Sequence, residues 1–169
     1  INRPEAYNLF FRKHRPLIDR ALRYEVDERL LVSGEVFKPL LESEMAAVAD
    51  RMAAEGVEAI AIMFMHSYRN PAHEVAAKAY FSRRFPHLFV SASHELSQEY
   101  REYERTSTIA ANAYIGPRVS SYLTEIVDHL AAKRFAGGFL IVQSTGGLYD
   151  ADAAGRECIR MLESGPAAG

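Results

Sequence analysis

The clearest hydrophobic pattern in the chain is a broad apolar stripe after residue 117. Its members recur at the three- and four-residue spacing of one helix face, with charged residues opposite: Val119, Tyr122, Leu123, Ile126, Val127 and Leu130. The spacing predicts a helix that ends at Ala136-Gly137-Gly138. Residues before Gly116-Pro117 are also helical in pattern, so we expect two helices with a break at that dipeptide.

A second pattern predicts a β-α-β unit between residues 57 and 92. Val57 to Met65 is a continuous apolar run, which is typical of a strand covered on both faces in a parallel sheet. Asn70 can cap a helix that starts at Pro71 and ends near Arg84, before Pro86. Leu88 to Ala92 is then the second, parallel strand, with a right-handed crossover between the two.

Weaker signals predict two elements before this unit. Alternation at Leu22, Tyr24 and Val26, and again near Val36, predicts a β-hairpin with its turn at residues 28–34. A helix is expected from Ser43 to the stop at Gly56.

The C-terminal part reads as a strand followed by a short helix. A strand is expected over Gly138 to Val142, followed by Gln143-Ser144-Thr145-Gly146-Gly147 and a helix from Ala151 to about Leu162. Together the patterns predict an α/β fold, with a mixed, largely parallel sheet, flanking helices and an N-terminal β-hairpin.

Composition narrows the class of protein. The chain has 169 residues, of which 49% are apolar, so one sizeable core is possible. The net charge is −2 and no basic block exists, which argues against nucleic-acid binding. The longest apolar stretch is too short to cross a bilayer and no secretion signal is visible, so we expect no membrane association and a cytoplasmic location. The single cysteine, Cys158, sits in an apolar segment and reads as a core thiol, not as a nucleophile.

Two polar segments are candidates for chemistry. Residues 143–147 could form an oxyanion or phosphate cradle from hydroxyls and unobstructed amides at a strand end, or an ordinary strand-to-helix turn. Residues 94–108 are dense in charge and hydroxyl groups, and a solvated face laced by ion pairs is the simpler interpretation of that segment.

His66 is a third candidate because it follows the apolar strand. The carboxyl end of a parallel strand is where α/β sheets bind ligands, so His66 could act as an acid or a base there. A hydrogen-bonded structural role is the alternative for His66 and for nearby His73. No residue spacing typical of a metal site accompanies them, so no metal is expected.

Four motifs in register resemble one known family. They are residues 64–74 (Phe-Met-His-Ser-Tyr-Arg-Asn-Pro-Ala-His-Glu), residues 101–108 with Asn112-Ala113-Tyr114, residues 143–147, and Ser164-Gly165-Pro166-Ala167-Ala168-Gly169. In this order and spacing the chain resembles the hydantoinase A/5-oxoprolinase family. On that resemblance, residues 1–95 are the C-terminal part of the family's N-terminal region. Residues 96–169 are then a helical segment and the start of the hydantoinase A domain, and the two parts form one compact fragment.

The resemblance implies an ATP-dependent enzyme of the actin-like ATPase superfamily, and hence part of a ribonuclease H-like lobe. Such enzymes open a cyclic amide, such as a hydantoin or 5-oxoproline, through a phosphorylated amide. Related members activate ketones for carboxylation, so a subunit of a ketone carboxylase is an alternative. A non-catalytic assembly module, with the helix after Pro117 in subunit contacts, is a third possibility.

The resemblance also implies which residues do what. Glu104, Arg105 and His66 are the catalytic candidates. The nucleotide side of the cleft would be lined by the hydroxyl and glycine segments, Ser144, Thr145, Gly146, Gly147, Ser164, Gly165 and Pro166. ATP and Mg²⁺ are the expected cofactors of the full-length protein, a cyclic amide its substrate, and a hydantoinase B-type subunit or fused domain its partner.

One departure limits this expectation. The family carries an Asp-x-Gly-Gly-Thr phosphate loop near its N-terminus and a second Gly-Gly-Thr loop after Ser-Gly-Pro-Ala, and this chain contains neither. We therefore expect an internal fragment that does not bind ATP tightly by itself.

Overall fold

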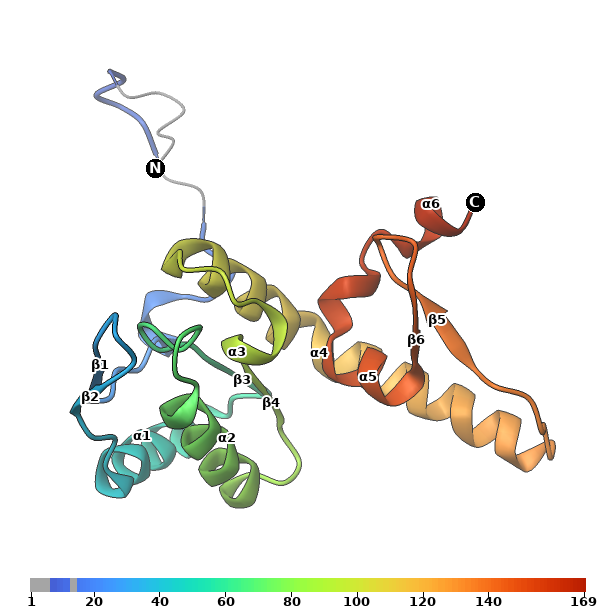
Figure 1. The fold of residues 1–169 in the computed structure, drawn as a ribbon, viewed down its shortest axis with the longest axis horizontal. Coiled ribbons are helices and arrows are strands. Elements are labelled where there is room, and N and C mark those ends of the chain that lie inside the picture. Colours follow the sequence, from blue (N-terminus) through green and yellow to red (C-terminus); the bar gives the residue numbers. More distant parts are fainter. Residues whose placement is uncertain (1–6, 13–14) are drawn as a thin grey trace.

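The computed structural model describes residues 7–12 and 15–169 as two lobes connected by one long helix (Figure 1). The strands are β1 (Arg29–Leu30), β2 (Val36–Lys38), β3 (Ala59–Ile62), β4 (Phe89–Ala92), β5 (Leu140–Val142) and β6 (Leu148–Asp150). The helices are α1 (Glu42–Glu55), α2 (Ala72–Arg84), α3 (Ser93–Leu96), α4 (Glu102–Ala132), α5 (Ala151–Arg156) and α6 (Ser164–Ala168), with 3₁₀ turns at Arg20–Leu22 and Cys158–Met161. The α/β class and the N-terminal hairpin are confirmed, and the described strands form three two-stranded sheets.

The first lobe is built on the predicted β-α-β unit. Strands β3 and β4 are parallel, and α2 connects them. Ile60 and Ile62 are buried, whereas the alternating Ala59 and Ala61 are half-buried, so one face of β3 points into the core. Side chains of α1, α2 and both strands fill this core: Met45, Val48, Ala49, Met52, Ile60, Ile62, Ala77, Phe81, Phe85 and Ala92. The strand is shorter than the predicted residues 57–65 because the backbone turns away after Ile62.

The stop of α1 agrees with the sequence signal, and the starts of α1 and α2 do not. Helix α1 stops at Gly56, whose φ of +63° is the left-handed conformation that favours glycine. It begins at Glu42, so Ser43 is not its cap. Helix α2 begins at Ala72 with Pro71 at the cap position, one residue later than expected, and Asn70 Oδ1 accepts the Ala72 N–H at 3.0 Å.

The hairpin prediction was right for the turn and wrong for the first strand. The turn between β1 and β2 closes through a hydrogen bond from Leu31 N to Glu35 O at 2.9 Å. Leu22, however, lies in a 3₁₀ turn, and Tyr24 and Val26 pack as half-buried side chains against the first core.

Helix α4 corrects the expected break at Gly116-Pro117. It is one helix of 31 residues, and Pro117 lies inside it. A Cβ at position 116 would lie 2.4 Å from the Phe89 ring, so glycine is needed there because the helix passes directly over β4. Pro117 removes only the hydrogen bond to the carbonyl four residues earlier, a loss that packing on both lobes offsets.

The second lobe packs on the C-terminal half of α4. Strands β5 and β6 are antiparallel, and Ile141 packs with Leu123 and Ala154 in a second core. Residues 143–147 are therefore the turn of a hairpin, and the expected strand-to-helix turn was wrong. The helix expected over residues 151–162 is divided into α5 and the Cys158–Met161 turn, since the backbone leaves helical geometry at Glu157.

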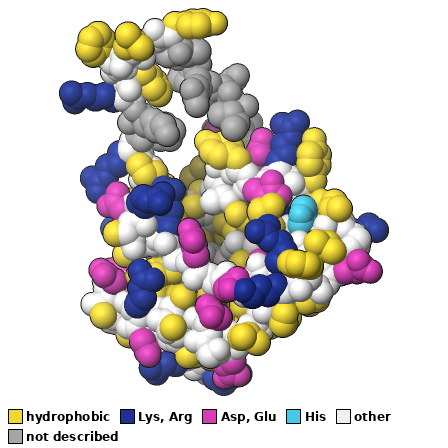
Figure 2. Space-filling view, turned by 90° about the vertical axis from the view of Figure 1, so that its left-hand side faces the viewer, with side chains coloured by type: hydrophobic (Ala, Val, Ile, Leu, Met, Phe, Trp, Pro, Cys, Tyr) yellow, Lys and Arg dark blue, Asp and Glu magenta, His cyan; other side chains and the backbone are white. Residues whose placement is uncertain are grey.

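The surface carries mixed charge. On the face in Figure 2, acidic and basic side chains are interspersed, and hydrophobic side chains gather at the tip of the N-terminal arm. No helix in residues 7–12 and 15–169 has the length and apolarity needed to cross a membrane.

Candidate functional site

The most elaborate polar structure in the molecule lies at the carboxyl ends of β3 and β4. Five side chains from three helices and one loop meet there in what we call the strand-end network: Ser67, Glu74, Ser93, His94 and Arg105. Ser67, Glu74, Ser93 and Arg105 are each 1% exposed or less. Carboxyl ends of parallel strands are the usual ligand-binding edge of an α/β sheet, so the network occupies the position where a site is expected.

Glu74, from the first turn of α2, is the negative centre of the network. Its Oε1 accepts hydrogen bonds from the Phe64 N–H at 2.9 Å and the Ser93 hydroxyl at 2.7 Å. Its Oε2 accepts the His94 N–H at 2.8 Å and lies 2.8 Å from the ring Nδ1 of the same residue. Four polar contacts thus replace the water that this carboxylate loses on burial.

Arg105, from the first turn of α4, is the positive centre. Its Nη1 donates to the Ser67 hydroxyl and, at 3.4 Å, to the Ser93 hydroxyl, and its Nη2 donates to the Phe64 carbonyl at 2.8 Å. The guanidinium also lies over the Tyr68 ring, 5.6 Å from its centre. The solvated face expected for residues 94–108 is therefore wrong at this position.

The two opposite charges are connected through the backbone of one residue, Phe64, and through two serines. The N–H of Phe64 binds Glu74, and its carbonyl binds Arg105. The Ser67 and Ser93 hydroxyls lie 3.3 Å apart between the two charges. The network thereby fixes the path of the chain just after β3.

That path places His66 in a strained conformation. Its φ is +59°, an unusual value for a residue other than glycine, and its carbonyl accepts the N–H groups of Arg69 at 2.9 Å and Asn70 at 3.1 Å. The ring is half-buried, and among the described residues its buried Nδ1 has no hydrogen-bond partner. The same holds for the buried Nε of Arg105. Strained backbone and unpaired polar atoms of this kind are concentrated at functional sites.

Glu104 does not join this network. It is half-buried on α4 and forms a pair with Arg101 at 3.6 Å, next to solvent. Adjacent positions on a helix point about 100° apart, so burial of Arg105 leaves Glu104 at the surface.

His73 has a hydrogen-bonded structural role, which was the alternative interpretation from the sequence. Its Nδ1 lies 2.6 Å from Glu28 Oε2, and both side chains are less than 10% exposed. Sequence reasoning missed Glu28, Ser67 and Ser93 as polar core residues, because no local pattern connects them with residues so far away in the chain.

The other candidate segments, residues 143–147 and 164–166, are brought together in the second lobe. The Ser144 hydroxyl accepts the Glu163 N–H at 3.0 Å, and the Ser144 N–H donates to the Arg160 carbonyl at 2.6 Å. Thr145, Gly146, Gly147, Gly165 and Pro166 are exposed, whereas Ser164 is half-buried. Gly146 has a φ of +84°, which the hairpin turn requires.

These two segments alone do not form a binding site for a nucleoside triphosphate. The amides of Gln143, Ser144 and Gly146 already donate to backbone carbonyls, so the unobstructed amides expected in this loop are largely occupied. In the described part of the chain, no three His, Cys, Asp or Glu side chains form a group that could hold a metal ion. The segment can border a nucleotide site only together with residues from elsewhere.

Asn112 connects the two lobes. It is fully buried in α4, and its Nδ2 donates to the Ser91 hydroxyl and to the Arg156 carbonyl, both at 2.9 Å. Its Oδ1 accepts the Ile159 N–H at 2.9 Å.

Nearby Cys158 is fully buried, and burial raises the pKa of its thiol to about 11, which confirms a core thiol.

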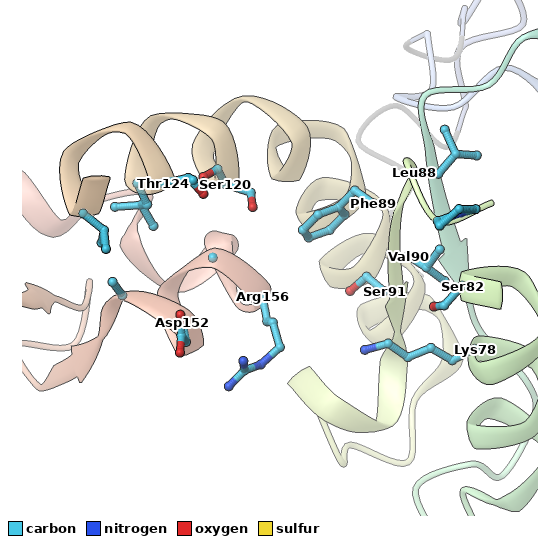
Figure 3. A pocket seen from close by; sticks show the side chains of 15 residues that line it. Lys78, Ser82, Leu88, Phe89, Val90, Ser91, Ser120, Thr124, Asp152 and Arg156 are labelled. Atoms are coloured by element: carbon cyan, nitrogen blue, oxygen red, sulfur yellow. Dashed lines mark hydrogen bonds between the residues drawn. The ribbon is translucent and has the colours of Figure 1, made fainter. Parts of the chain in front are cut away.

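A cavity of about 470 Å³ opens beside this contact, between α2 and β4 on one side and α4 and α5 on the other (Figure 3). Its floor is apolar, and its rim carries hydroxyls and three charged side chains, Lys78, Asp152 and Arg156. None of the candidate residues from the sequence lines it.

Comparison with known families decides where the chain belongs. Residues 1–85 match the hydantoinase/oxoprolinase N-terminal region, and residues 105–169 match the hydantoinase/oxoprolinase domain. The chain belongs to the hydantoinase/oxoprolinase family. The expectation from the four motifs is confirmed.

Individual relatives support the same assignment. An uncharacterized protein of Methanocaldococcus jannaschii is 43% identical over 99% of this chain, which covers 25% of that protein. The structure of the ATP-dependent caprolactamase from Pseudomonas jessenii superposes with a TM-score of 0.83 at 34% identity, over 96% of this chain and 23% of that one. A nucleotide-free acetone carboxylase also gives a TM-score of 0.83, at 26% identity, over 94% and 22% of the two chains. The chain thus spans about a quarter of the length of these relatives.

Proposed function

We propose that this chain is part of an ATP-dependent hydrolase that opens a cyclic amide of the hydantoin, 5-oxoproline or lactam type. The observation that carries the proposal is the likeness to the ATP-dependent caprolactamase, in which fold agreement and 34% identity extend over 96% of the chain. Within the strand-end network, Ser67, Glu74 and Arg105 lie in the motifs from which the family resemblance was drawn.

The proposed reaction uses ATP because a ring amide is a poor electrophile. Transfer of the γ-phosphoryl group to the amide oxygen gives ADP and an activated carbon. Water then adds to that carbon, the ring C–N bond breaks to release the amine and leave an acyl phosphate, and a second water hydrolyses the acyl phosphate to phosphate and the carboxylate of an amino acid. In this proposal the full-length protein binds ATP and Mg²⁺ in an actin-like lobe, and this chain forms part of that lobe.

His66 and Arg105 have different roles in this proposal. His66 is the candidate for contact with substrate, since it lies at the end of β3 with a strained backbone and an unpaired Nδ1. Arg105 is fully buried, so we assign it the positioning of the loop that carries His66. Glu104 keeps a weaker candidacy, because its contact is with Arg101 at the surface.

The second lobe is assigned to the nucleotide side of the cleft. In this proposal, Ser144, Thr145, Gly146 and Gly147 border it, and Ser164, Gly165 and Pro166 lie where this lobe meets a further part of the full-length protein. The contact between Ser144 and Glu163 supports their acting as one unit. A second, hydantoinase B-type subunit is the proposed partner, since one relative is named as subunit alpha of a caprolactamase. The proposed compartment is the cytoplasm, consistent with a single free cysteine.

A ketone carboxylase subunit is the second candidate, favoured by the equal TM-score to acetone carboxylase. Both reactions begin with phosphorylation of a carbonyl oxygen, so the same lobe could serve either one. Identity is lower in this comparison, 26% against 34%, and for that reason the hydrolase is preferred.

The two functions are separated by one assay of the full-length protein with its partner subunit. ADP formation and release of a primary amine are measured with 5-oxoproline, hydantoin and caprolactam, and ADP formation alone with acetone plus bicarbonate. We expect ATP-dependent amine release with at least one cyclic amide. ADP formation that needs acetone and bicarbonate, without a response to any cyclic amide, would replace the hydrolase by the carboxylase.

A further inference from the structure

The cavity between the two lobes has the composition of a small-molecule site. Its volume of about 470 Å³ lies in the range of ligand pockets, roughly 300–1,000 Å³. Phe89 and Val90 of β4 and Leu123 and Val127 of α4 give it an apolar floor. Hydroxyl groups lie among them, from Ser82, Ser91, Ser120 and Thr124.

The charged side chains at its rim are of two kinds. Lys78 is neutralised, since its ammonium donates to both carboxylate oxygens of Glu95, at 2.7 and 2.6 Å. Asp152 and Arg156 are exposed on α5, and their side chains form no hydrogen bond or ion pair within the described part of the chain. The cavity therefore offers one free anion and one free cation, one helical turn apart.

The positions of these groups are fixed by the surrounding structure. The Arg156 carbonyl is bound by buried Asn112, which anchors the end of α5 against α4. In Figure 3, Lys78 extends from the α2 side into the space between the two walls, and Arg156 extends from α5, with Asp152 on its side of that space. A carboxylate placed beside Arg156 would receive charge-assisted hydrogen bonds, and an ammonium group would bind Asp152.

We propose that this cavity binds a linear aliphatic amino acid whose carboxylate and ammonium groups are separated by a short hydrocarbon chain. Arg156 holds the carboxylate, Asp152 holds the ammonium group, and the apolar floor holds the chain between them. Such a zwitterion complements the free pair on α5, because each carries one positive and one negative charge. Ring opening of a cyclic amide yields a compound of this class, so a role in product feedback rests on the proposed function, whereas the binding itself does not.

The test is titration calorimetry of the full-length protein, in the absence of ATP, with three probes of equal chain length. We expect 6-aminohexanoate to bind more tightly than hexanoate or hexylamine. Arg156→Ala should weaken 6-aminohexanoate at least tenfold, and Asp152→Asn should make 6-aminohexanoate and hexanoate bind alike. Arg118→Ala is the matched control, because Arg118 is an exposed arginine of α4 outside the cavity, and it should leave all three affinities unchanged.

Two results would overturn the proposal. One is the absence of binding by 6-aminohexanoate, and the other is an equal effect of Arg156→Ala and Arg118→Ala. Both substitutions lie at exposed side chains, so thermal melting checks that the variants remain folded. Normal ring-opening turnover without binding at Arg156 would reject this site alone, and binding without any ring opening would reject the proposed function alone.

Discussion

Replacing Arg105 tests whether the strand-end network holds the first lobe together. Arg105→Ala removes a fully buried cation that donates to the Ser67 and Ser93 hydroxyls and to the Phe64 carbonyl. The Phe64 carbonyl and both serine hydroxyls then lose a charged donor in a buried site. Each hydrogen bond to a charged group contributes about 1.5–3 kcal/mol, so the loss of unfolding free energy should reach about 3–5 kcal/mol.

The expected shift is large enough to measure without ambiguity. For a chain of this size each kcal/mol moves the melting temperature by about 2–4 °C, so Arg105→Ala should melt roughly 6–20 °C lower. Thermal unfolding followed by far-UV circular dichroism gives the shift, and urea titration gives the free energy.

Two further variants separate charge from geometry. Arg105→Lys keeps the positive charge but replaces two nitrogens by one, which cannot bind Ser67 and Phe64 from both arms of a planar fork. Its loss should fall between those of wild type and Arg105→Ala. Arg101→Ala, on the exposed side just before α4, is the control and should change stability by less than about 0.5 kcal/mol. A loss below about 1 kcal/mol for Arg105→Ala would refute the argument that the network stabilises the fold.

Three other substitutions or conditions test separate features. Gly116→Ala should destabilise the protein by about 1–3 kcal/mol in urea titration, because its Cβ would overlap the Phe89 ring; an unchanged midpoint would mean that the ring moves freely. Gly146→Val should lower ring-opening turnover of the full-length enzyme more than its stability, since its φ of +84° disfavours a β-branched residue by about 1–2 kcal/mol and no atom lies within 4 Å of an added Cβ. Cys158, with a thiol pKa raised from 9.0 to about 11 by burial, should resist a thiol-reactive probe at pH 8 and contribute stability that is lost as the pH rises from about 9 through 11. Rapid labelling of Cys158 at pH 8 in the folded protein would contradict the last of these.

Hydrophobic periodicity was sufficient to predict the elements whose burial depends on residues close together in the sequence. The β-α-β unit and the stop of α1 at Gly56 both follow from residues within a few positions of one another. These features depend on backbone propensity and on one apolar face, both of which are visible in a short window of sequence.

The dipeptide Gly116-Pro117 shows where local rules fail. Both residues are unfavourable inside a helix, and the sequence therefore predicted a break. The helix continues because it lies between two cores, and glycine lets it approach Phe89 of the sheet. Tertiary packing outweighed propensity, and that packing involves a residue 27 positions away in the chain.

The strand-end network shows a different limit, although part of it was open to prediction. Its members come from residues 64, 67, 74, 93, 94 and 105, and no local rule pairs a carboxylate on one helix with a guanidinium on another. Helical phase nevertheless marks Arg105. The buried positions of α4 fall at the three- and four-residue spacing of one face, and the first of them is charged: Arg105, Ile109, Asn112, Ala113, Gly116 and Leu123. Where a charged or amide side chain occupies the phase of an apolar stripe, burial is the consistent interpretation, and a buried opposite charge must lie across from it. Helical phase therefore separates Arg105 from Glu104, which points about 100° away, whereas Arg101 is exposed because it precedes the helix.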